Sequence, residues 1–161
     1  MKRPAGLVLS LAFALVALCG PALAQTAATL SGAVSAPLTL DAATLKAFPP
    51  TAIDITFQSG SGTETGHYSG VLLWTLLQKA GLVNAPGKKT GLRHTLLVTG
   101  RDGYGVALAL GEIDPNYAGK SVILAFDGGT PPVSFDHLRL LVPGDAHGGR
   151  IVKDVATIEV Q

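Results

Sequence analysis

The residues best suited to chemistry lie near the C-terminal end of the chain, in a loop that follows an apolar segment and a Pro-Gly turn. They are His147, Gly148, Gly149, Arg150 and Lys153. Glycines permit close backbone approach, and successive N–H groups beside two positive charges suit an anionic or heteroaromatic ligand. Arginine offers a planar fork for a phosphate, a carboxylate or a heterocycle edge, and lysine adds a compact charge. We therefore expect a ligand-binding loop here, with His147 as a hydrogen-bonding or stacking partner.

Simpler interpretations stand beside this one. In an ordinary loop, Arg150 would be a structural counter-ion for Asp145 or Asp154. The four histidines of the chain have no zinc-ligand spacing, and the sequence contains no Gly-x-Ser-x-Gly nucleophile elbow. The histidines outside the loop are therefore expected to be surface or loop residues.

The N-terminal segment has the pattern of a secretory signal peptide. Two cations precede an apolar run from residue 7 to 18, and Ala22-Leu23-Ala24 supplies the small-x-small cleavage pattern. The run is shorter than the ~20 residues of a membrane span, and a lipoprotein site at Cys19 is disfavoured by Leu18 before it. We expect cleavage after Ala24, a periplasmic location, and no membrane insertion of the remaining chain.

Removal of residues 1–24 changes the composition. The formal net charge of +1 becomes −1 because Lys2 and Arg3 leave, and the one cysteine, Cys19, leaves with them. An exported chain without disulfides must be held by its core. A near-neutral charge without a basic block argues against nucleic-acid binding.

Hydrophobic patterning predicts one α+β domain over residues 25–161, dominated by strands. Alternation and turn signals predict strands at residues 29–34, 37–40, 53–58, 94–100, 104–110, 122–126, 138–142 and 155–160. Helical spacing and capping signals predict helices at residues 42–47, 71–80 and 112–117. A glycine- and serine-rich loop is expected at residues 59–62, and Asp102-Gly103 marks a hairpin.

The order of these elements resembles the oxidoreductase molybdopterin-binding domain of sulfite oxidases and their bacterial relatives. Residues 30–49 resemble its opening, and residues 68–81 its tyrosine-x-Gly-Val, leucine-rich helix and Ala-Gly stop. Residues 102–104 match its hairpin, and residues 140–153 its Val-Pro-Gly loop with arginine and lysine. The resemblance covers nearly all of the mature chain and implies a sulfite-oxidase-like fold.

One departure from the family bears on the chemistry. In the family's enzymes, the strand equivalent to residues 53–58 ends in the cysteine that ligates molybdenum, and Ser59 stands in that place here. A thiolate is a soft and strongly donating ligand, whereas a serine alkoxide is rarely available near neutral pH. The resemblance therefore implies a pterin or molybdopterin as ligand, with molybdenum disfavoured because the mature chain has no cysteine.

The resemblance also implies which residues bind. It places Arg150 and Lys153 at the site that holds a pterin phosphate or an anionic substrate, together with the glycine loop and Ser59. Tyr104 and Asp102, at the hairpin tip, are further candidates to border the pocket. No catalytic residue is assigned, and no metal ligand is expected.

Three functions are compatible with these features. The first is a periplasmic pterin-binding protein that acts as a ligand carrier or as the partner of a membrane sensor, without metal–thiolate chemistry. The second is a molybdopterin-dependent oxidoreductase with atypical metal ligation. The third is a degenerate domain that serves only as an interaction module. The missing cysteine disfavours the second, and retention of Arg150 and Lys153 favours the first over the third.

Overall fold

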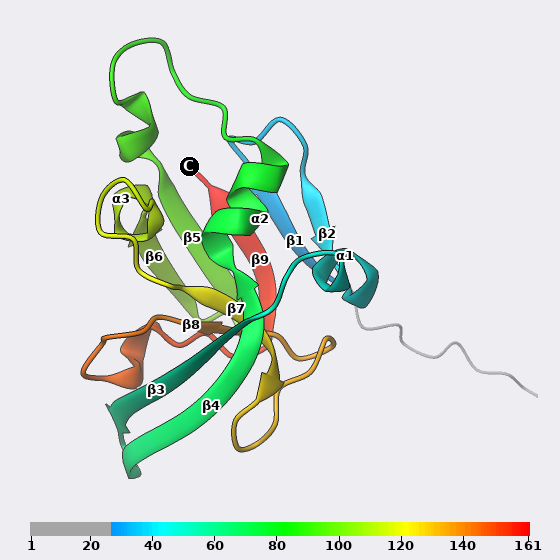
Figure 1. Ribbon diagram of the computed structural model, residues 1–161, viewed down its shortest axis with the longest axis vertical. Helices are drawn as coiled ribbons and strands as arrows, with labels where there is room; N and C mark the ends of the chain where they lie inside the picture. Colours follow the sequence, from blue (N-terminus) through cyan, green and yellow to red (C-terminus); the bar gives the residue numbers. More distant parts are fainter. Residues whose placement is uncertain (1–26) are drawn as a thin grey trace, which may run out of the picture.

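The computed structural model describes residues 27–161 (Figure 1). The predicted signal peptide, its cleavage site and Cys19 lie outside the described residues. Within this part of the chain, no helix is both long enough and apolar enough to span a membrane.

One sheet has five strands. Their order is β2 (Leu38–Leu40), β1 (Ala28–Gly32), β9 (Val155–Val160), β5 (Thr95–Gly100) and β6 (Gly105–Ala109). β1 and β9 are parallel, and the other neighbours are antiparallel. Burial alternates along β5 and β6, as expected for strands with one face in the core. The predicted hairpin at Asp102-Gly103 is confirmed.

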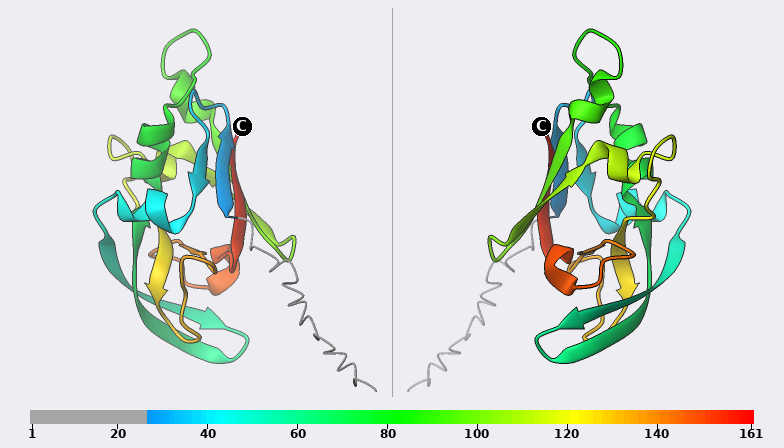
Figure 2. Two further views of the ribbon diagram at one scale, coloured as in Figure 1. Left: turned by 90° about the vertical axis from the view of Figure 1, so that its right-hand side faces the viewer. Right: turned by 90° about the vertical axis from the view of Figure 1, so that its left-hand side faces the viewer.

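The second sheet has four antiparallel strands. Their order is β3 (Thr51–Ser59), β4 (Gly62–Leu72), β7 (Ile123–Gly128) and β8 (Arg139–Leu141). β3 and β4 form a long curved ribbon that extends past β7 and β8 (Figure 2). The loop predicted at residues 59–62 is instead a tight turn, because Ser59 pairs directly with Gly62.

Helices are few and short in residues 27–161. They are α1 (Ala42–Lys46), α2 (Leu73–Ala80) and α3 (Leu110–Ile113), with 3-10 turns η1 (Thr90–Arg93) and η2 (Gly148–Arg150). Asp41 caps α1 as predicted by accepting from the Thr44 amide at 2.7 Å. The predicted start of α2 at residue 71 is wrong, because residues 71 and 72 pair with β7. The predicted helical turn at 112–117 is also misplaced, since Pro115 disfavours helical geometry at Asp114 and the turn ends before it.

The core divides into two clusters on opposite faces of the four-stranded sheet. The larger cluster joins α2, the five-stranded sheet and side chains such as Leu124 and Leu140. The smaller cluster, on the other face, contains Tyr68, Ile123 and Leu141. The α+β prediction is confirmed, and the face with the smaller cluster is the one that carries the pocket described next.

Candidate functional site

A pocket of about 540 Å³ lies between the β3–β4 ribbon, the start of β8 and the loop that follows β8. This volume is typical of a small-molecule site. The predicted site residues in its lining are Ser59, His147, Gly148, Gly149 and Lys153. The other residues in its lining are Phe57, Gln58, Gly60, Glu64, Thr130, Pro131, Arg139 and Ile151. The structure therefore brings five of the eight predicted residues together.

The loop returns to β8 at its base. The Leu140 amide donates to the Val152 carbonyl at 2.9 Å, and the two residues form an antiparallel bridge. In an antiparallel pair, the residue before one partner lies across from the residue after the other. The bridge therefore sets Arg139 beside Lys153, and both line the pocket.

Arg139 is a buried cation at this site. Its residue exposure is 9%, and it pairs across the sheet with Ala125, a member of the smaller core cluster. Its Nη1 donates to the Tyr68 hydroxyl at 3.0 Å, and its Nε has no hydrogen-bond partner among residues 27–161. Buried donors are normally satisfied, so an unused N–H on an arginine that lines a pocket points to a partner that the protein chain itself does not supply.

Sequence reasoning missed Arg139. The available signal was a single charge inside the apolar run from Leu138 to Val142. Charged residues are rarely buried unless they are paired, so an arginine inside such a strand deserved a place among the candidates.

Tyr68 holds the guanidinium of Arg139 in position. The guanidinium carbon lies 5.8 Å from the centre of the tyrosine ring. Gly66 and Gly129 flank the ring so closely that a Cβ at either position would collide with it, and Gly129 has a φ of +77°. The ring therefore occupies a fitted slot, and its hydroxyl is directed at Arg139.

The rim of the pocket is formed where the loop lies against the end of β3. The backbone N–H of Gln58 donates to the Ala146 carbonyl at 2.9 Å, and Gln58 forms a parallel β-bridge with His147. Gly148 lies against the Phe57 ring, where an added Cβ would come within 2.7 Å of a ring carbon. The absence of a side chain at Gly148 is what allows this contact.

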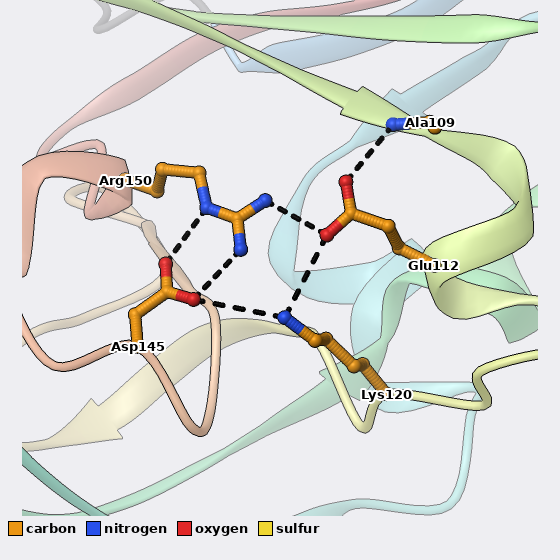
Figure 3. A network of polar contacts seen from close by, with 5 residues as sticks. All are labelled: Ala109, Glu112, Lys120, Asp145 and Arg150. Atoms are coloured by element: carbon orange, nitrogen blue, oxygen red, sulfur yellow. Dashed lines mark hydrogen bonds and ion pairs between the residues drawn. The ribbon is translucent and has the colours of Figure 1, made fainter.

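Arg150 does not line the pocket. Its Nε and Nη2 each donate to an oxygen of Asp145 at 2.7 Å, and its Nη1 donates to Glu112 at 2.8 Å (Figure 3). Lys120 Nζ lies 3.7 Å from both carboxylates. Arg150 thus occupies the counter-ion position towards Asp145 and links the loop to α3; its predicted ligand contact stays a prediction.

The network shifts the ionisation of its members. The hydrogen bond from Arg150 lowers the pKa of Asp145, with the charges of Arg150 and Lys120 assisting and partial burial opposing. For Glu112, partial burial raises the pKa, but hydrogen bonds from Arg150 and the Ala109 amide outweigh it, so the pKa is lowered overall. The two carboxylates in turn raise the pKa of Arg150.

Tyr104 and Asp102 also lie outside the pocket lining. The Tyr104 hydroxyl donates to the Gly149 carbonyl and so contacts the loop from the side of the β5–β6 hairpin. Asp102 accepts from the Tyr104 amide at 2.9 Å and stabilises the turn. Their predicted contacts with a ligand remain predictions. In the structure, Tyr104 and Asp102 help to position the loop.

Ser59 lines the pocket, but its hydroxyl is used by the turn. It donates to the Gly62 carbonyl at 3.2 Å and accepts from the Ser61 amide at 3.0 Å. Within residues 27–161, no three histidine, cysteine, aspartate or glutamate side chains are grouped in a way that could hold a metal ion. The arrangement as a whole provides cationic donors beside flat apolar walls, which suits binding of an anion attached to a ring system.

Comparison with known proteins agrees with the fold. The sequence profile of the oxidoreductase molybdopterin binding domain matches residues 24–161. The solved structure of the sulfane dehydrogenase SoxCD from Paracoccus pantotrophus aligns with a TM-score of 0.66 and 21% sequence identity, over 86% of this chain. The chain spans 39% of the length of that chain, and the likeness is one of fold. The curated proteins contain no match.

Tyr68→Phe tests whether the Tyr68 hydroxyl holds Arg139 in position. The variant removes the hydroxyl that accepts from Nη1, and we expect the free energy of unfolding to fall by about 1–3 kcal/mol, because a buried charged donor loses its partner. Urea denaturation measures the difference. Tyr117→Phe, at a residue that is 49% exposed, is the control and should change stability little. Equal effects of the two substitutions would contradict the assigned role.

Glu112→Gln tests the ion-pair network. At pH 7 we expect it to lower the free energy of unfolding by about 1 kcal/mol. The pKa of Glu112 is lowered from its usual 4.5, so its stabilisation is complete above that pH and is lost as pH falls through the lowered pKa. Denaturation curves of wild type and variant should therefore converge in acid, once the pH is below the lowered pKa of Glu112.

The matched control is Glu159→Gln, at an exposed glutamate of β9. It should leave the free energy of unfolding unchanged at pH 7 and in acid. A Glu112→Gln difference that persisted undiminished in acid would show that charge is not the source of the stabilisation.

Proposed function

The chain belongs to the oxidoreductase molybdopterin-binding domain family, and from that premise we propose that it is a periplasmic protein that binds a pterin without metal–thiolate chemistry. Its role in this proposal is that of a ligand carrier or of a partner to a membrane sensor. The periplasmic part of the proposal is supported by the signal-peptide pattern at residues 1–24.

The observation that carries the proposal is the unused Nε donor of Arg139 beside Lys153 in the pocket wall. A guanidinium and an ammonium on adjacent positions form a site for a phosphate or a carboxylate. Phe57, Pro131 and Ile151 supply apolar surface to the same pocket. A pterin that carries an anionic group matches both kinds of surface.

The family's cofactor fits this pocket in part. Its pterin and phosphate would be held by Arg139, Lys153 and the backbone of the loop at Gly148 and Gly149. When bound in the family's enzymes, the group supplies a redox-active metal that is ligated by a cysteine thiolate. The resemblance assigns that place to Ser59 in this chain, and the Ser59 hydroxyl is engaged in the turn. The part of the cofactor that carries the metal therefore does not fit this pocket.

The alternatives are distinguishable by direct measurement. The exported chain is expressed in a host that synthesises the molybdenum cofactor, and the purified protein is assayed for bound metal and for pterin fluorescence. We expect fluorescence without stoichiometric metal. Stoichiometric molybdenum would instead establish the oxidoreductase with atypical ligation. If the protein holds no metal, shows no pterin fluorescence and gives no calorimetric response to added pterins, the interaction module is the remaining function.

Substitution of the pocket cations tests the binding site. Arg139→Met and Lys153→Met should each weaken calorimetric binding of pterin-6-carboxylate by about 1.5–3 kcal/mol, because each removes a charged hydrogen bond. Lys153 is exposed, and removal of the buried charge of Arg139 relieves the cost of keeping that charge away from water, so both variants are expected to fold. Lys79→Met, at an exposed position of α2, is the control. Unchanged affinity in both pocket variants would remove these cations from the site.

A further inference from the structure

The β3–β4 ribbon has one apolar and one polar face. Residues directly opposite each other on paired strands share a face. The outer face is polar, and its side chains bond across the ribbon in the pairs Asp54–His67, Thr56–Thr65 and Gln58–Thr63. The inner face carries the alternate pairs Ile53–Tyr68, Ile55–Gly66, Phe57–Glu64 and Ser59–Gly62.

Glu64 is the exception on this inner face. Its neighbours Ile55, Phe57 and Tyr68 belong to or pack against the smaller core cluster, whereas Glu64 is charged and lines the pocket. Residues 62–65 of β4 are all exposed, so Glu64 lies beyond the buried part of this face. It is the one charged side chain among these four pairs, and it lies where the ribbon borders the pocket.

The carboxylate of Glu64 is also unpaired. Within residues 27–161 it forms no hydrogen bond or ion pair, although Lys153 and Arg139 line the same pocket. No oxygen of the Glu64 carboxylate lies within 4.0 Å of a side-chain nitrogen of either cation, so Glu64 does not pair with them. An ionised carboxylate is an acceptor only, so a ligand that meets Glu64 must present donors.

The cations and the acceptor lie at different positions along β4. The Tyr68 hydroxyl that contacts Arg139 lies beside Gly66, two residues from Glu64, a distance of about 7 Å between the Cα atoms of residues 64 and 66. The ligand best suited to this spacing is anionic at one end and carries N–H donors at the other. A purely anionic ligand would gain nothing from Glu64.

We propose that Glu64 determines the specificity of this pocket by accepting two parallel N–H donors from the ring N3–H and 2-amino group of a 2-amino-4-oxopteridine. Arg139 and Lys153 hold the anionic group of the same ligand. The inference rests on the proposed function and narrows its ligand class. The 2-amino edge matches a carboxylate as a guanidinium does, through two parallel hydrogen bonds. A 2,4-dioxopteridine presents a carbonyl oxygen at the same place, which a carboxylate repels.

The test compares two probes on two proteins. Wild type and Glu64→Gln are titrated by calorimetry with pterin-6-carboxylate and with lumazine-6-carboxylate, its 2,4-dioxo counterpart. Wild type should prefer the pterin. Glu64→Gln should weaken pterin binding by about tenfold, because a charged acceptor is lost. It should not weaken lumazine binding, because a glutamine amide can donate to the 2-oxo group.

The outcomes separate the inference from the proposed function. Glu159→Gln is the control and should bind both probes as wild type does. If Glu64→Gln binds both probes as wild type does, or weakens both equally, the specificity role of Glu64 is overturned and pterin binding stands. If wild type binds neither probe, the proposed function fails and the inference fails with it.

Discussion

The pairing of Leu140 with Val152 is the contact on which the pocket depends. It returns the loop after β8 to the sheet and sets Arg139 beside Lys153. Two cations at adjacent positions repel each other, so their juxtaposition requires support from elsewhere. Tyr68 supplies it for Arg139, and the backbone bond at 2.9 Å holds the register. A ligand anion between the two cations would relieve the remaining repulsion.

The loop itself is held from three directions. The ribbon contacts it through Gln58, the β5–β6 hairpin through Tyr104, and α3 through Glu112 and Arg150. These contacts come from both sheets, so the rim of the pocket is built across the junction between them. The position of the loop is consequently set by the whole domain, since its contacts come from both sheets and from α3.

Local signals in the sequence predicted much of the fold. Asp41 caps α1 through a bond three residues away, and the alternation of β5 and β6 is visible along each strand. Errors arose where pairing with distant residues decided the outcome, as at residues 71 and 72, which joined β7 in place of α2. The site follows the same rule. The glycine loop was found by its composition, and Asp145, five residues from Arg150, was one of the counter-ions considered for it. The bond from Arg150 to Glu112, 38 residues away, had no local signal. Arg139 was missed because the face of a strand on which a charge lies is set by its partner strand.

The position of Ser59 has a consequence for how such a domain changes over evolutionary time. Ser59 is the last residue of β3 and is partly exposed, whereas Arg139 and Tyr68 are enclosed by the sheet, and Gly66 and Gly129 flank the Tyr68 ring. Exchange of Ser59 affects only the local bonds of the turn, while exchange of the buried pair disturbs the packing of the sheet. Substitution at the end of β3 can therefore change the chemistry of the pocket while the buried pair that positions its cations stays in place.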